Sequence, residues 1–100
     1  MYKSNLNYLI NIYIKMKELY KPFKSKVKNK KYSVYVKSNN KSGMKLIHFG
    51  DSRYEQFKDK LGHYKHLDHG DIQRKKNYYS RHGKATSKDT AKYWSHKILW

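Results

Sequence analysis

Residues 31–49 read KYSVYVKSNNKSGMKLIHF, and this stretch decides the fold. Tyr32, Val34 and Val36 recur at every second position, and β-branched and aromatic residues with this period are typical of a strand. Residues 44–49 supply a second strand of similar composition. The intervening SNNKSG contains Asn and Gly, which tolerate the positive φ values that hairpin connections require. The sequence therefore predicts a β-hairpin with strands over residues 32–37 and 44–49.

Two helices are predicted after the hairpin. Asp71 opens DIQRKKNYYSRHG, a helical stretch with Gly83 at its expected C-terminal stop. Ser87 is placed to cap a last helix in KDTAKYWSHKILW. One face of that helix would carry apolar residues at i, i+3 and i+7, namely Ala91, Trp94 and Ile98. Because an isolated two-stranded hairpin is marginal in water, we expect both helices to cover it in a small, single-domain α+β fold.

A shorter helical turn is predicted between the hairpin and these helices. Ser52 and Glu55 stand at capping-box spacing, so the turn would run through Tyr54 and Phe57 and end by Gly62.

The N-terminal part is expected to be organised separately. Apolar residues recur near the helical period over residues 4–20, and Pro22 stops the pattern, which predicts an amphipathic helix. Met16 is an alternative start, which would make residues 1–15 an upstream extension. The predicted division is an N-terminal helix or extension (1–23), a basic connector (24–31) and the α+β domain (32–100).

Charge is the strongest indicator of function. The chain has 24 Lys and Arg against 7 Asp and Glu, a formal net charge of +17 over 100 residues. Such an excess stabilises nothing in an isolated fold and indicates an anionic partner: nucleic acid, a membrane surface or an acidic protein lattice. No apolar run reaches the ~18 residues of a membrane span, so we expect no membrane partner. The absence of Cys excludes disulfides and thiolate zinc sites within this sequence.

Two basic segments are the candidate nucleic-acid-binding regions. The first is the lysine run of residues 24–31, which is equally consistent with a solvated linker. The second is the helix after Asp71, where Arg74 and Arg81 lie about two turns apart and can face one side. Arg presents a planar fork suited to phosphate, and interleaved Tyr rings can pack or stack on bases. The predicted binding residues are Lys24, Lys26, Lys28, Lys30, Lys31, Arg74, Lys75, Lys76, Tyr78, Arg81, His82 and Lys84.

Catalytic and metal sites are not expected. His63, His66 and His69 recur every three residues near two Asp, but Gly62 and Gly70 bracket them in a predicted loop, so no metal site and no metal-dependent nuclease is favoured. The carboxylates are dispersed, and no nucleophile elbow or Gly-rich phosphate loop is present. The sequence therefore predicts a non-enzymatic protein without a cofactor.

The segments KKYSVYVK, KLIHFGD and RKKNYYSRHGKATSKDTAKYWSHKILW carry a resemblance to a known family. They resemble a small basic domain family of nucleocytoplasmic large DNA viruses and some tailed phages, over roughly residues 30–100. The most specific part is the RH…TAKYWS…W ending. Some phage relatives have RH-x-C…WSC there, which implies a metal clip, whereas this chain has Lys84 and His96 at the two Cys positions.

The resemblance implies a viral protein, located in the virion or in the viral factory of the host-cell cytoplasm. Nucleic acid is the expected partner, with DNA favoured over RNA. The alternative is a minor capsid or cement protein whose basic surface contacts acidic capsid subunits, with Trp94 and Trp100 as anchors. The resemblance transfers no catalytic residues, and the sequence leaves the oligomeric state open.

Overall fold

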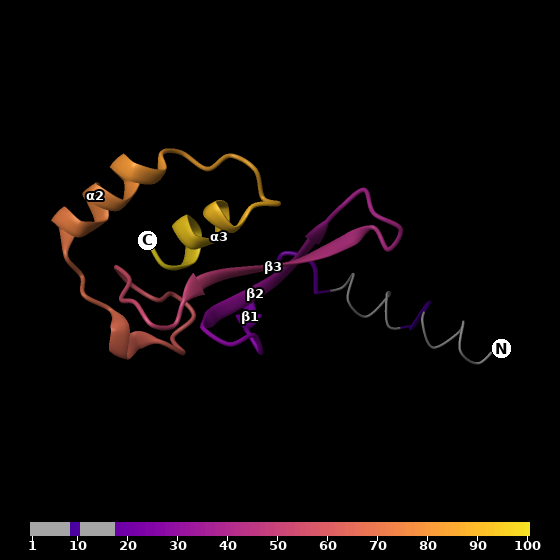
Figure 1. The fold of residues 1–100 in the computed structure, drawn as a ribbon, viewed down its shortest axis with the longest axis horizontal. Coiled ribbons are helices and arrows are strands. Elements are labelled where there is room, and N and C mark those ends of the chain that lie inside the picture. Colours follow the sequence, from indigo (N-terminus) through magenta and orange to yellow (C-terminus); the bar gives the residue numbers. More distant parts are fainter. Residues whose placement is uncertain (1–8, 11–17) are drawn as a thin grey trace.

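The computed structural model describes residues 9–10 and 18–100. These form a three-stranded antiparallel sheet in the order β1-β2-β3, followed by two helices, which confirms an α+β architecture (Figure 1). The elements are β1 (Phe23–Lys24), β2 (Lys30–Lys37), β3 (Met44–Asp51), the 3-10 turn η1 (Lys65–Leu67), α2 (Ile72–His82) and α3 (Ala91–Ile98). Most of the helix expected over residues 4–20 lies outside the described residues.

The predicted hairpin is confirmed as β2 and β3. Tyr32 pairs with Phe49, and Lys37 pairs with Met44 beside the connecting loop. Within that loop the Asn40 side chain bonds both backbone groups of Met44: Nδ2 donates to the carbonyl at 2.6 Å and Oδ1 accepts from N–H at 3.2 Å. Gly43 adopts φ +76°, as the Asn- and Gly-rich loop predicts.

The basic connector expected over residues 24–31 is a second, tight hairpin. Phe23 and Lys24 pair with β2, and the Phe23 ring stacks on Tyr35 at a centroid distance of 5.8 Å. The turn places Asn29 at φ +65°, and its carbonyl accepts from Ser52 N–H at 3.1 Å. The lysine run is therefore held against the segment that follows β3, because apolar and backbone contacts override its self-repulsion.

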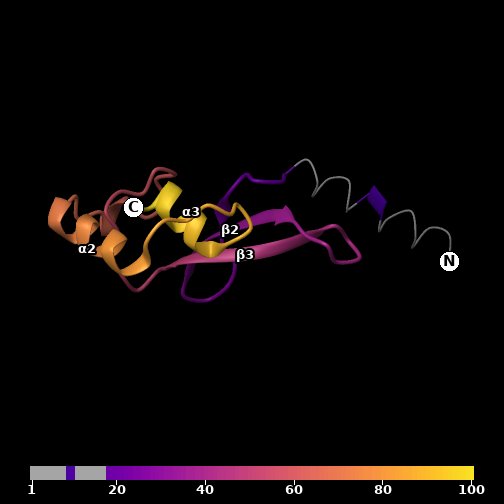
Figure 2. The same ribbon diagram turned by 90° about the horizontal axis from the view of Figure 1, so that it is seen from above.

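The core lies between the sheet and α3 (Figure 2). Trp94 is 2% exposed, packs on Phe49 at a centroid distance of 6.4 Å and donates its indole N–H to the Lys88 carbonyl at 2.8 Å. Ile98 is buried with it, whereas Ala91 is exposed, so only two residues of the predicted apolar face reach the core. The buried cluster is Tyr32, Val34, Val36, Phe49, Trp94, Ile98 and Leu99.

Both predicted ends of α2 are confirmed. Asp71 caps the helix by accepting from Arg74 N–H at 3.1 Å, and Gly83 ends it. The helix lies beyond the end of the sheet, where Tyr78 stacks on Trp100 at a centroid distance of 4.3 Å (Figure 1). Of the two helices expected to cover the hairpin, α3 does so, while α2 packs on the C-terminal end of the chain.

Two predicted helix starts are wrong. Residues 52–57 form a turn and an irregular loop, because Asp51 accepts from Arg53 N–H at 2.9 Å and the Glu55 side chain pairs with Arg74. Likewise α3 begins after Thr90, whose hydroxyl accepts from Tyr93 N–H, while the Ser87 hydroxyl donates to Asp89.

Candidate nucleic-acid interface

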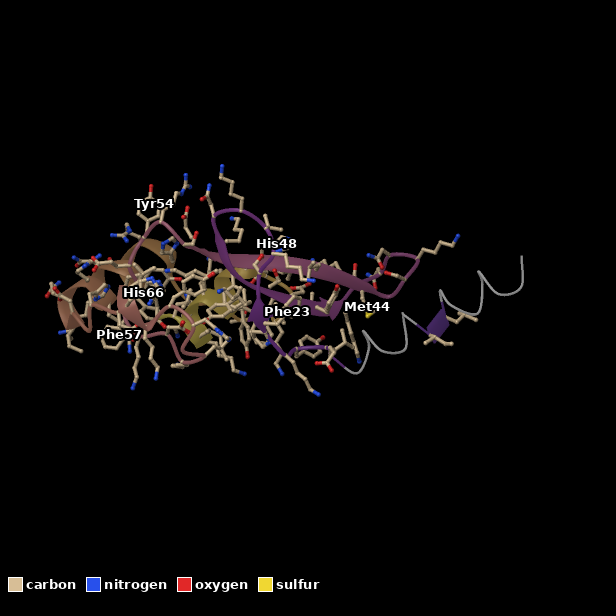
Figure 3. The ribbon with its side chains drawn as sticks, turned by 90° about the horizontal axis from the view of Figure 1, so that it is seen from below. Phe23, Met44, His48, Tyr54, Phe57 and His66 are labelled. Atoms are coloured by element: carbon tan, nitrogen blue, oxygen red, sulfur yellow. The ribbon has the colours of Figure 1, made fainter. Side chains whose placement is uncertain are left out.

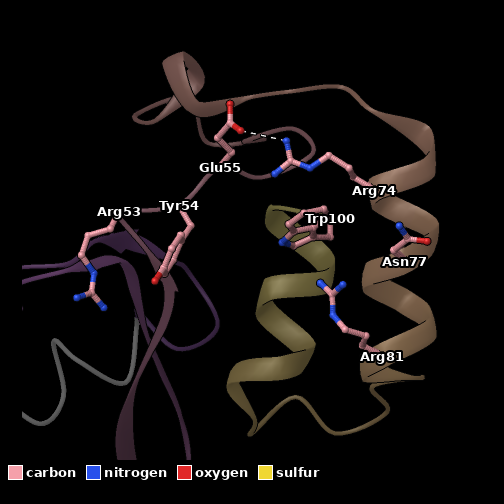
Figure 4. A pocket seen from close by; sticks show the side chains of 7 residues that line it. All are labelled: Arg53, Tyr54, Glu55, Arg74, Asn77, Arg81 and Trp100. Atoms are coloured by element: carbon pink, nitrogen blue, oxygen red, sulfur yellow. Dashed lines mark hydrogen bonds and ion pairs between the residues drawn. The ribbon is translucent and has the colours of Figure 1, made fainter.

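A groove lies where the turn after β3, α2 and the C-terminal residue meet. It consists of two adjoining hollows of about 500 and 580 Å³, which share Tyr54, Glu55 and Trp100. Figure 4 shows the first of them. The Lys, Arg and His side chains that line this groove include Lys30, Arg53, Arg74, Arg81, His82 and Lys92. We call this surface the basic groove.

The two arginines predicted to share a face of α2 both line the basic groove. Arg74 donates to Glu55 Oε1 at 3.0 Å, and Arg53 donates to Asp51 Oδ2 at 2.7 Å. Arg81 forms no ion pair with any of the described residues. The groove therefore holds three guanidinium groups, of which one is available to an external anion without breaking an ion pair.

Aromatic side chains form two sides of the basic groove. Trp100 is stacked on Tyr78 with an angle of 5° between the rings. Burial raises the pKa of Tyr78 to about 12, so this backing ring stays neutral at physiological pH. On the other side Tyr54 is 66% exposed and projects away from the fold (Figure 3). The Arg53 guanidinium carbon lies 5.8 Å from its ring centroid.

A buried lysine fixes the backbone of the groove at Tyr54. Lys31 is 2% exposed, and its Nζ donates to the Tyr54 carbonyl at 2.8 Å and to Gln56 Oε1. Burial lowers the pKa of Lys31, against the opposing effect of nearby carboxylates such as Asp59. Lys31 therefore cannot reach a phosphate in this structure, which corrects its sequence-based assignment as a binding residue.

A second set of buried hydrogen bonds anchors the loop that carries the groove. Tyr32 donates its hydroxyl to Asp59 Oδ2 at 2.5 Å, and Asp68 Oδ1 accepts from Asp59 N–H at 2.7 Å and from Gln56 Nε2 at 2.6 Å. Burial raises the pKa of Tyr32 well above its ordinary value, and the bond to Asp59 adds to this. For Asp59, burial acts to raise the pKa, but the donated hydrogen bonds outweigh it and the pKa is lowered.

His96 joins α2 to α3. Its Nε2 lies 2.7 Å from the Gly83 carbonyl, and its Nδ1 lies 2.9 Å from the Tyr78 hydroxyl. Because a carbonyl only accepts, the neutral imidazole donates from Nε2 and accepts at Nδ1. His96 thus holds α2 and the Tyr78–Trp100 stack in place.

The other sequence-predicted residues divide into two groups. Lys30, Arg74, Arg81 and His82 line the basic groove, and Tyr78 lies buried beneath it, so Tyr78 acts as backing for Trp100 instead of as a contact. Lys75 lies over the Phe57 ring at 4.6 Å. The remaining predicted residues lie outside the two hollows: Lys24, Lys26, Lys28, Lys76 and Lys84.

Four further residues that line the basic groove were not predicted from the sequence: Arg53, Tyr54, Asn77 and Lys92. Trp100 was expected only as a capsid contact. The adjacent basic and aromatic pair Arg53 and Tyr54 was the available signal, but the capping-box interpretation placed it in a helical turn.

The carboxylates are too few to balance the 24 Lys and Arg, and most of them are engaged within the fold. Apart from Glu18, every acidic side chain bonds within the fold: Asp51, Glu55, Asp59, Asp68, Asp71 and Asp89. Few acids are thus left to neutralise the surface lysines, and the positive field must be balanced by counterions or by an anionic partner.

The histidine cluster does not form a metal-binding group. The His63 ring packs against Tyr32 at 6.0 Å, and the His69 ring packs against Trp100 at 5.2 Å. Among the residues that the structure describes, no three or more His, Cys, Asp or Glu side chains are grouped to hold a metal ion. Within the same part of the chain, no helix is long and apolar enough to cross a membrane.

Comparisons with models of protein families, with curated proteins and with solved structures give no match for this chain.

Proposed function

We propose that the protein is a non-enzymatic, virion-associated basic protein that binds nucleic acid through phosphate contacts without sequence specificity. The basic groove is the primary contact, and DNA is the expected partner. The lysine turn between β1 and β2 adds a second contact, because the bond between Ser52 and Asn29 holds it beside the segment that carries Arg53.

The observation that carries this proposal is the state of the groove arginines. Arg81 lacks an ion pair among the described residues, and it shares the groove with Arg53 and Arg74. Guanidinium groups bind phosphate oxygens through paired hydrogen bonds, and such contacts fix position without reading sequence. The net charge of +17 supplies the long-range attraction.

The test is binding of the purified protein to DNA by fluorescence anisotropy at two salt concentrations. Arg81→Glu is expected to weaken binding and to flatten its salt dependence, since each lost phosphate contact lowers the logarithmic salt slope by about 1. Lys41→Glu is the matched control, because it reverses one exposed charge in the β2–β3 loop, at the other end of the sheet from α2 (Figure 1).

An equal loss of DNA affinity in Arg81→Glu and Lys41→Glu would show that net charge drives binding without a specific contribution from the basic groove. Weak binding that is insensitive to salt would contradict nucleic-acid association and favour the capsid or cement alternative. The burial of Trp94 already removes one of the two anchors on which that alternative depended.

A further inference from the structure

We infer that the basic groove receives an unpaired base, so that the protein binds single-stranded nucleic acid in preference to duplex. The inference rests on the proposed function and deepens it, because it concerns what the groove takes in addition to phosphate. The aromatic groups carry it.

Trp100 is a pre-organised stacking surface. Tyr78 lies parallel behind it at a centroid distance of 4.3 Å, and the hydrogen bond between Tyr78 and His96 holds that backing ring. The indole therefore loses little conformational freedom when a base packs on it. Base-on-aromatic stacking tolerates every sequence, since each base has a π-face.

Tyr54 lines the same hollow as Trp100, on the side of the turn after β3 (Figure 4). Its backbone is fixed, because its carbonyl accepts from Lys31 Nζ, whereas its side chain is 66% exposed. Tyr54 and Trp100 thus bring two aromatic rings to a hollow of about 500 Å³, a volume within the usual range for ligand pockets.

Polar groups are placed for the sugar-phosphate of the same nucleotide. Arg74, Asn77 and Arg81 occupy positions i, i+3 and i+7 of α2 and all line the hollow. Asn77 Oδ1 accepts from Gln73 Nε2 at 3.0 Å, so its amide nitrogen is presented to the groove as a donor (Figure 4). Such a donor can bond a phosphate or a base-edge acceptor.

Duplex DNA cannot use the aromatic part of this site. Its base faces are covered by neighbouring base pairs, so it presents phosphates and base edges but no free base face. A single strand can turn one base into the groove while its phosphates contact the arginines, so single strands gain a stacking contribution that duplex lacks.

The experiment compares a short oligothymidylate with a DNA duplex of equal length at one salt concentration, by anisotropy and by tryptophan emission. Trp94 is buried, so a change in emission on stacking reports Trp100, and Trp100→Phe should abolish it. We expect tighter binding of the oligothymidylate, with quenching that the duplex does not produce.

Tyr54→Ala leaves the carbonyl that anchors Lys31 intact. It should weaken oligothymidylate binding roughly 5- to 100-fold and weaken duplex binding by a smaller factor, because a duplex offers no unpaired base to the ring. Tyr54→Phe keeps the ring and should retain the parent affinity for the oligothymidylate.

Equal affinity for the oligothymidylate and the duplex, with no effect of Tyr54→Ala, would overturn the single-strand inference. If duplex binding still depended on salt in that case, the proposed function would stand. No binding of either probe at low salt would overturn both.

Discussion

Arg74 Nη1 and Glu55 Oε1 lie 3.0 Å apart, so the basic groove contains a carboxylate at the position where a phosphate would bind Arg74. Both side chains are about half exposed, and an incoming phosphate can compete for the guanidinium. The pair therefore reduces the affinity of the groove for an external anion.

Glu55→Gln should raise the affinity for nucleic acid roughly two- to fivefold, because it frees Arg74 and removes a repulsive charge. Anisotropy at low salt measures the effect. Glu18→Gln is the control, since it changes the net charge equally at an exposed position that does not line the groove. The same gain in both variants would mean that the pair has no specific influence.

Lys30 and Lys31 are neighbours in sequence with opposite expected roles. Lys31→Met leaves the Tyr54 carbonyl and Gln56 Oε1 without their donor, so the free energy of unfolding should fall by about 1–3 kcal/mol. Lys30→Met should leave the free energy of unfolding nearly unchanged and lower the salt slope of binding by about 1. Urea denaturation and binding at several salt concentrations separate the two effects. If Lys30→Met instead lowered the free energy of unfolding and Lys31→Met instead lowered the salt slope of binding, the burial of Lys31 would be contradicted.

Gly50 is a position where an added Cβ would clash with buried neighbours. It has φ +75°, and an added Cβ would lie 2.7 Å from Leu99 Cδ1 and 3.1 Å from Lys31 Cβ. Gly43 has a similar φ of +76° with no atom within 4 Å of such a Cβ. Thermal unfolding of Gly50→Ala should show a loss about 1–3 kcal/mol larger than that of Gly43→Ala, since only the former adds overpacking to backbone strain. Equal losses would show that β3 and Leu99 do not pack as described.

Asp59 gives the stability a defined dependence on pH. Its folded-state pKa is lowered: burial opposes the shift, and hydrogen bonds from Tyr32 and from backbone N–H groups overcome it. The unfolded chain therefore binds the proton more tightly, so this stabilisation is complete above about pH 4 and is lost as the pH falls through the folded pKa. Asp59→Asn should lower the free energy of unfolding near neutral pH and reduce its decline in acid. Denaturation curves for Asp59→Asn that fell with acidity as steeply as those of the parent would contradict this role.

The sequence was sufficient to predict the elements that depend only on local residue patterns. The alternation of Tyr32, Val34 and Val36 predicts β2 because one face of the hairpin is buried under α3. Asp71 and Gly83 predict the ends of α2, since capping involves only neighbouring backbone groups.

The sequence was insufficient where distant partners compete for a side chain. Glu55 fits a capping box locally, but it pairs with Arg74, 19 residues away. Lys31 looks identical to the surface lysines around it, yet Gln56 and the Tyr54 carbonyl bury it. Of the groove, only the α2 face carrying Arg74 and Arg81 follows from periodicity. The contribution of Tyr54 and Trp100 depends on tertiary packing.

The most direct test of the account is to map the contact surface by NMR. The side-chain N–H resonances of Arg74, Arg81 and Trp100 are followed while a short oligonucleotide is added at low salt. If the basic groove is the interface, these resonances will shift together and saturably, and the backbone amides of Lys41 and Gly43 in the β2–β3 loop will stay unchanged. Shifts confined to the lysine turn between β1 and β2, or spread evenly over the basic surface, would contradict the groove as the nucleic-acid interface.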